Sequence, residues 1–183
     1  MASKEGRCAV KVADVSDFWC GQDEIRILDP NITACREKRD LMRQYKETGA
    51  ILDFTQGLDI RLLNGDDIED INHMRLRTLH FAWDNPKDDL EGKFREFAKG
   101  FRRKSNIGMV YCLTNFENCS TQEHIERALH RIYLLRDMGF DPFCMIYDKP
   151  HAPRAIKDLQ RWCNNKIIFK SVKRFEDYRQ RKE

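Results

Sequence analysis

Short apolar runs, separated by amphipathic segments, recur along the chain. They lie at residues 25–28, 51–54, 78–83, 109–113, 143–147 and 167–169. The runs begin at intervals of roughly 24 to 34 residues, which is the length of one strand–helix unit. The pattern therefore predicts six short strands that alternate with helices.

Capping residues mark several of the intervening helices. Gly49 follows a helical segment where a C-terminal glycine is typical, and Pro86 occupies a favourable helix start. Ser120 and Glu123 have the spacing of a capping box, and Gly139 closes the helix that they open. The predicted helices span residues 36–46, 66–74, 86–101, 120–139 and 155–164.

Alternation of this kind predicts an α/β fold with a parallel sheet, because a helical crossover returns each strand parallel to the last. A partial or closed (βα) barrel and an open doubly wound sheet both fit the periodicity. No linker or low-complexity tract divides the chain, so residues 1–183 are expected to form one domain. The charged tail at residues 173–183 is predicted to be a frayed or surface helix.

Composition narrows the class of protein. Of the 183 residues, 41% are hydrophobic and 34% are charged, which is typical of a globular protein. The net charge of +3 is too small and too evenly mixed to favour nucleic-acid binding. No apolar run approaches the roughly 20 residues of a membrane span, and the N-terminus lacks a signal-peptide core. We therefore expect a cytoplasmic protein without a membrane partner.

The seven cysteines do not form a recognisable metal or redox motif. Their number is odd and no pair has CxxC spacing, which argues against a zinc ribbon and a thioredoxin-type site. Cys112 and Cys144 fall inside apolar runs, where buried thiols are common. Reduced core cysteines are expected, and no metal ligand is assigned.

Polar residues gather where the predicted strands end. Ligand sites of parallel α/β folds lie at the carboxyl ends of the strands. The candidate binding residues there are Asp29, Asn31, Gln56, Asp59, Arg61, Trp83, Asp84, Asn85 and Asn115. Asp and Asn are also ordinary turn and cap residues, and a tryptophan in an apolar run is more often core than a purine-stacking group. Together the set suits a small zwitterionic, nucleotide-like ligand, whose carboxylate Arg61 can hold with two hydrogen bonds.

Several segments resemble one protein family. The stretch DFTQGLDIRL at 53–62, together with LHFAWD at 79–84, is similar to a group of radical SAM proteins from bacteria and phages. Further similarity lies at residues 27–31, 143–150 and 159–166, so the resemblance follows the chain in order.

The resemblance implies an incomplete (βα) barrel of about six strands that binds S-adenosylmethionine against a [4Fe–4S] cluster. The family's cluster-binding CxxxCxxC motif is absent from this chain. In relatives that motif precedes a segment like residues 3–8, so we expect a radical SAM-like domain that lacks its first strand and cluster loop. Such a chain would be inactive alone. It would be a truncated protein, one half of a split protein whose second chain supplies the cluster, or a fragment of a longer protein.

Two other functions fit the sequence. One is a non-catalytic interaction module that pairs with another chain through an exposed strand at 25–28. The other is a nucleotide-binding enzyme that needs no cluster, although no phosphate-binding loop is present.

Overall fold

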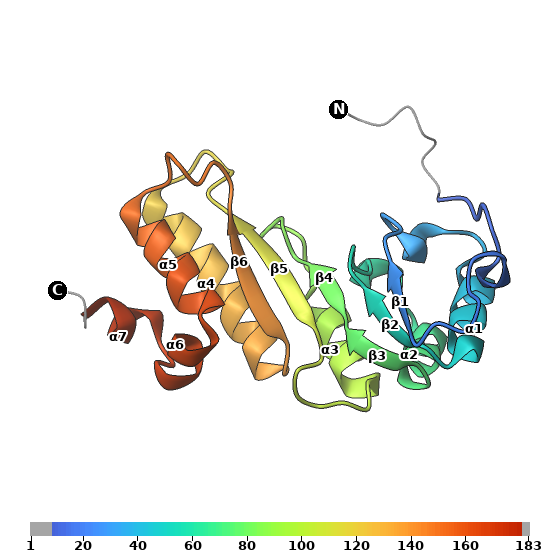
Figure 1. The fold of residues 1–183 in the computed structure, drawn as a ribbon. Coiled ribbons are helices and arrows are strands. Elements are labelled where there is room, and N and C mark those ends of the chain that lie inside the picture. Colours follow the sequence, from blue (N-terminus) through green and yellow to red (C-terminus); the bar gives the residue numbers. More distant parts are fainter. Residues whose placement is uncertain (1–8, 181–183) are drawn as a thin grey trace.

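The computed structural model describes residues 9–180 (Figure 1). Its strands are β1 (Glu24–Ile27), β2 (Ile51–Phe54), β3 (Arg75–Thr78), β4 (His80–Ala82), β5 (Met109–Thr114) and β6 (Asp141–Ile146). Its α-helices are α1 (Lys38–Thr48), α2 (Gly65–Asn72), α3 (Glu91–Gly100), α4 (Thr121–Asp137), α5 (Arg154–Asn164), α6 (Lys166–Ser171) and α7 (Phe175–Gln180). Three short 3-10 helices are η1 (Val15–Asp17), η2 (Ile32–Ala34) and η3 (Ile60–Leu62).

The strands form two parallel three-stranded sheets, with the orders β1-β2-β3 and β4-β5-β6. Strand order follows chain order, and every paired neighbour is parallel. Leu79 connects β3 of the first sheet to β4 of the second, and its carbonyl accepts a hydrogen bond of 2.8 Å from the backbone N–H of Met109 in β5. The predicted parallel α/β class is confirmed, and the described strands do not close into a barrel.

One face of each sheet is buried by the helices. In β5 the buried Val110 and Cys112 alternate with Tyr111, which is only partly covered. Phe81, Phe94 and other apolar side chains from strands and helices together form the larger core. On the opposite face, Tyr111 stacks on His80 and meets Phe143 edge-on, with ring centroids 5.9 and 5.7 Å apart.

The prediction of a strand at residues 167–169 is wrong. These residues belong to α6, which begins after Asn165. The Asn165 side chain accepts hydrogen bonds from the backbone N–H groups of Ile167 and Ile168, both at 3.1 Å, and so caps the helix. Phe169 is buried in the core and Ile168 packs partly against it, whereas Ile167 is 81% exposed. The local cap therefore outweighs the β propensity of an apolar triplet.

Two other boundaries differ from expectation. The run at 78–83 is not one strand but the end of β3, the connector and β4, which is why the total of six strands is still reached. The helix expected from Pro86 begins at Glu91, because Asn85 forms a turn in which its side chain accepts from the N–H of Lys87.

The expected surface tail contains α7, which packs into a second core. Phe175 and Tyr178 are buried there against Trp162 and its neighbours on α5. None of the helices described between residues 9 and 180 is long and apolar enough to cross a membrane.

Gly139 ends α4 as predicted, and it provides a test of the fold. Its φ angle is +92°, and an added Cβ would lie 2.6 Å from the carbonyl oxygen of Lys104. Gly139→Ala is therefore expected to lower the free energy of unfolding by about 2 kcal/mol, measured by urea denaturation. Gly92→Ala is the matched control, since a Cβ there meets no atom within 4 Å and alanine favours the helix. Equal stability of the two variants would contradict the backbone geometry.

Candidate binding site

A pocket of about 360 Å³ lies at the carboxyl ends of β2 and β4. This volume is within the range of small-molecule sites, roughly 300 to 1,000 Å³. Six of the nine sequence-predicted residues line it, namely Asn31, Gln56, Asp59, Arg61, Asp84 and Asn85. The other lining residues are Pro30, Gly57, Leu58, Phe81, Ala82, Asp88, Leu90 and Tyr111.

The loop after β2 brings Gln56 and Asp59 to the pocket by packing against the start of β4. Gly57 adopts a φ of +93°, and Leu58 donates its N–H to the carbonyl of His80 at 2.8 Å. A Cβ at Gly57 would lie 3.1 Å from the same carbonyl oxygen, so the glycine permits this close approach.

Asp59 and Arg61 form an ion pair at the pocket. The carboxylate accepts from Nε and Nη2 of Arg61, both at 2.8 Å, and it also caps η3 by accepting the Arg61 N–H. The guanidinium holds the pKa of Asp59 below its usual range. Among residues 9–180, Nη1 of Arg61 makes no hydrogen bond, so this amine is available to an anionic group of a ligand. The pair forms at the start of the 3-10 helix η3, of which Asp59 is the N-cap residue.

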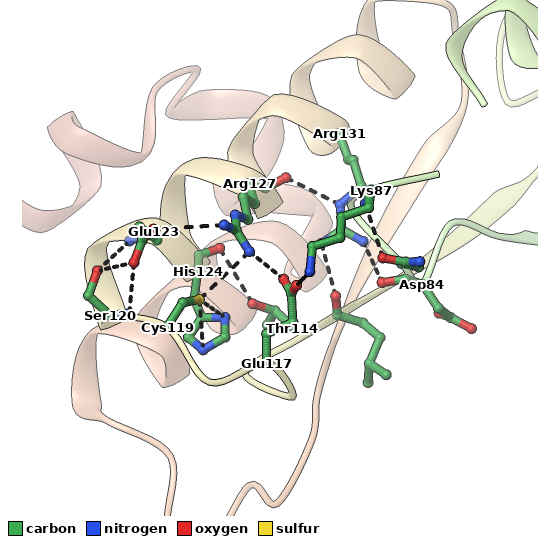
Figure 2. Close-up of polar contacts among 12 residues, drawn as sticks. Asp84, Lys87, Thr114, Glu117, Cys119, Ser120, Glu123, His124, Arg127 and Arg131 are labelled. Atoms are coloured by element: carbon green, nitrogen blue, oxygen red, sulfur yellow. Dashed lines mark hydrogen bonds and ion pairs between the residues drawn. The ribbon is translucent and has the colours of Figure 1, made fainter. Parts of the chain in front are cut away.

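Arg131 of α4 holds the loop after β4 in place (Figure 2). Its buried guanidinium donates to the carbonyl oxygens of Trp83, Asp84 and Leu113, the last two at 2.9 Å. These carbonyls lie at the ends of β4 and β5, so one side chain joins both strand ends beside the pocket.

The pocket carries more negative than positive charge. The lining residues include one guanidinium, that of Arg61, and three carboxylates, those of Asp59, Asp84 and Asp88. Neighbouring atoms partly desolvate the carboxyl group of Asp84 and raise its pKa, while the charge of Arg131 acts in the opposite direction. The site therefore favours a ligand with cationic groups and hydroxyls over a polyphosphate.

Three predicted residues lie elsewhere. Asp29 lines a separate hollow of about 760 Å³ beside β1, which Asn31 also borders. Trp83 is 3% exposed and stacks on Phe94, so it is a core residue that does not line the pocket. Asn115 donates from its side chain to the carbonyl of Tyr147 at 3.2 Å, in the connection after β5.

Three contributors to the site were not predicted. Asp88 follows Asn85 by one turn and accepts its amide at 3.0 Å, so the DNPKD sequence signals it. The alternation of β5 could have indicated Tyr111. No local pattern marks Arg131, because its partners are up to 48 positions away.

The described residues do not fit an iron–sulfur cluster. No group of three or more His, Cys, Asp or Glu side chains between residues 9 and 180 is arranged to hold a metal ion. Cys112 and Cys144 are buried in the cores, and Cys20 is exposed in a different part of the chain. Cys8 and the segment 3–8 lie outside the described residues. We derive no reaction step through a cluster.

The fold and pocket define a parallel α/β domain with a polar site at its strand ends. The chain has no significant match to a protein-family model, a curated protein or a solved structure.

Proposed function

We propose that this chain is a radical SAM-type protein whose pocket at the ends of β2 and β4 binds S-adenosylmethionine. The supporting observation is that six residues chosen from sequence, from three separate connections, line one pocket. In this proposal the two sheets form the wall of an incomplete barrel. A cluster, where present, is held by a second chain and not by the cysteines of this one, and this chain alone does not cleave the cofactor.

The charges of the pocket support this ligand. S-adenosylmethionine carries an ammonium and a sulfonium group against a single carboxylate. Its carboxylate is assigned to the open Nη1 amine of Arg61, and its cationic groups to the surrounding carboxylates. Gln56 and Asn31 offer amides to the ribose hydroxyls.

Isothermal titration of the purified chain tests the ligand class. We expect measurable binding of S-adenosylmethionine and about tenfold weaker binding of S-adenosylhomocysteine, which lacks the positive sulfonium. ATP should not bind, because its phosphates face three carboxylates. Tight ATP binding without affinity for the sulfonium compound would favour the cluster-independent nucleotide enzyme instead.

Asp84→Asn removes one negative charge from the pocket while keeping the size of the side chain, so it tests the contribution of that charge to ligand binding. The variant should bind S-adenosylmethionine about tenfold more weakly, equivalent to the loss of one charge-assisted contact. Because burial raises the pKa of Asp84, wild-type affinity should rise as the pH increases through that pKa, and the variant should lose this dependence. Asp66→Asn, at an exposed carboxylate of α2 outside the pocket, is the control and should leave the affinity unchanged.

Anaerobic reconstitution with iron and sulfide tests the cluster part of the proposal separately. This chain alone should not acquire a stoichiometric four-iron cluster, as judged by iron analysis and visible absorption. A full cluster on the isolated chain would refute the assignment of its ligands elsewhere, while leaving the titration result intact.

One observation favours a second function, that of an interaction module. Within residues 9–180, β1 pairs only with β2, and it borders the hollow of about 760 Å³, where Val10, Val12 and Leu28 are exposed. An unpaired edge of this kind can accept a strand from another chain. Light scattering after size exclusion distinguishes the cases, since a strictly monomeric protein would count against self-pairing at β1.

A further inference from the structure

A cysteine, a histidine and an arginine meet at the start of α4, away from the residues that line the pocket (Figure 2). The sulfur of Cys119 lies 3.5 Å from each ring nitrogen of His124 and 3.9 Å from Nη1 of Arg127. The sulfur is equally distant from both nitrogens, so neither in-plane lone pair points directly at it, and the imidazole ring must turn before one nitrogen can accept the thiol proton.

Helix geometry produces this arrangement. Ser120 and Glu123 form a reciprocal capping box, which fixes the start of α4 directly after Cys119. His124 and Arg127 are three positions apart and therefore share the helix face that the thiol approaches. The loop carboxylate of Glu117 accepts from Arg127 at 2.6 Å and holds the guanidinium beside the sulfur.

The surroundings contain the groups that activate a thiol. The amino-terminal end of a 17-residue helix and the Arg127 cation both stabilise a thiolate, and His124 can accept the thiol proton. Other charged groups facing the cluster are Glu117 from the loop, Glu123 from α4 and Lys87 from the loop after β4, which pairs with Glu117 at 3.0 Å.

The other described cysteines provide an internal comparison. Burial raises the pKa of Cys112 and Cys144 to about 12, and it also raises the pKa of Cys35 and Cys163. Cys20 is exposed and makes no hydrogen bond to a histidine or arginine within the described residues, which makes it the reference for an ordinary accessible thiol. Cys119 differs by combining partial exposure with a base and a cation.

We propose that Cys119 is a reactive-thiol site that low-molecular-weight disulfides modify, independently of ligand binding in the pocket. His124 takes the proton of the thiol, and the thiolate attacks one sulfur of the disulfide. A mixed disulfide forms on Cys119 as the S–S bond of the reagent breaks, and the released thiolate takes the proton from His124. The reagent is reduced by the exchange, and the protein sulfur is oxidised.

The test uses the full chain with glutathione disulfide as the reagent and mass spectrometry as the readout. Cys8→Ser with Cys20→Ser leaves Cys119 as the accessible thiol, and Cys8→Ser with Cys119→Ser leaves Cys20. At pH 7 the initial rate at Cys119 should exceed that at Cys20 about tenfold. Equal rates, or faster reaction at Cys20, would overturn the proposal.

His124→Gln should slow the reaction of Cys119 about tenfold and shift its rate–pH profile to higher pH. His130→Gln, at an exposed histidine of the same helix, is the matched control and should leave the profile unchanged. Because His124 is buried, circular dichroism must show that its variant folds. Arg127→Gln, at a half-exposed side chain, gives a second measurement that should also slow the reaction. Wild-type rates in both variants would refute activation by the cluster.

Discussion

Arg131→Met is expected to lower the free energy of unfolding by about 3 to 5 kcal/mol, measured by urea denaturation. The Arg131 side chain is 1% exposed and donates to the carbonyls at the ends of β4 and β5, and its Nε also donates to the Arg127 carbonyl at 3.2 Å. Methionine fills a similar volume but leaves these buried carbonyls without a donor. Each such group costs about 1 to 3 kcal/mol when its partner is removed.

The Arg131→Met substitution should also weaken ligand binding in the pocket. Without Arg131, the loop that carries Asp84 and Asn85 loses these hydrogen bonds to α4, so the proposed binding of S-adenosylmethionine should weaken even where the variant is still folded. Arg103→Met, at an exposed arginine, is the control and should change stability by less than about 0.5 kcal/mol. If the two variants were equally stable, the strand-end carbonyls would not depend on the guanidinium.

Much of the fold could be predicted because its signals are local. The run at 51–54 coincides with β2, and the capping box at Ser120 and the glycine at Gly139 mark the ends of α4. Periodicity failed where a single polar contact decides the outcome, as at Asn165, which caps α6 and converts an apolar triplet into helix. Hydrophobic periodicity also predicted one strand across Leu79, where the chain passes from the first sheet to the second. This change of sheet depends on the register between strands and not on hydrophobicity.

In the candidate site, too, residues marked by their local position could be predicted, and residues placed by long-range packing could not. Strand ends of a parallel sheet meet at one edge, so polar residues in those positions could be grouped without coordinates, and six of them line one pocket. Side-chain direction after a strand end is not encoded by position alone, which is why Trp83 turns into the core against Phe94. Arg131 was not predicted, because its contacts with the strand ends form only when α4 packs on the sheet.

Trp162→Ala is expected to cost about 3 to 5 kcal/mol of unfolding free energy and to release the C-terminal helices. The indole is fully buried, and its N–H donates to the carbonyl of Val172 at 2.8 Å. Phe169 of α6 and Phe175 of α7 pack against the ring, with centroids 4.9 and 5.7 Å away. Truncation therefore removes a side chain that contacts both helices and the segment between them, and it leaves a cavity in the second core.

Two further variants separate the roles of the Trp162 ring. Trp162→Phe keeps an aromatic ring but removes the hydrogen bond to Val172, so its stability should fall between those of wild type and alanine. Ile167→Ala on α6, at an exposed side chain, should change stability by less than about 0.5 kcal/mol. Hydrogen exchange should show faster exchange of the α6 and α7 amides in Trp162→Ala, while the β1 and β2 amides keep their protection relative to global unfolding. If exchange increased equally throughout the chain, the two cores would unfold as one unit, and the local role assigned to Trp162 would be wrong.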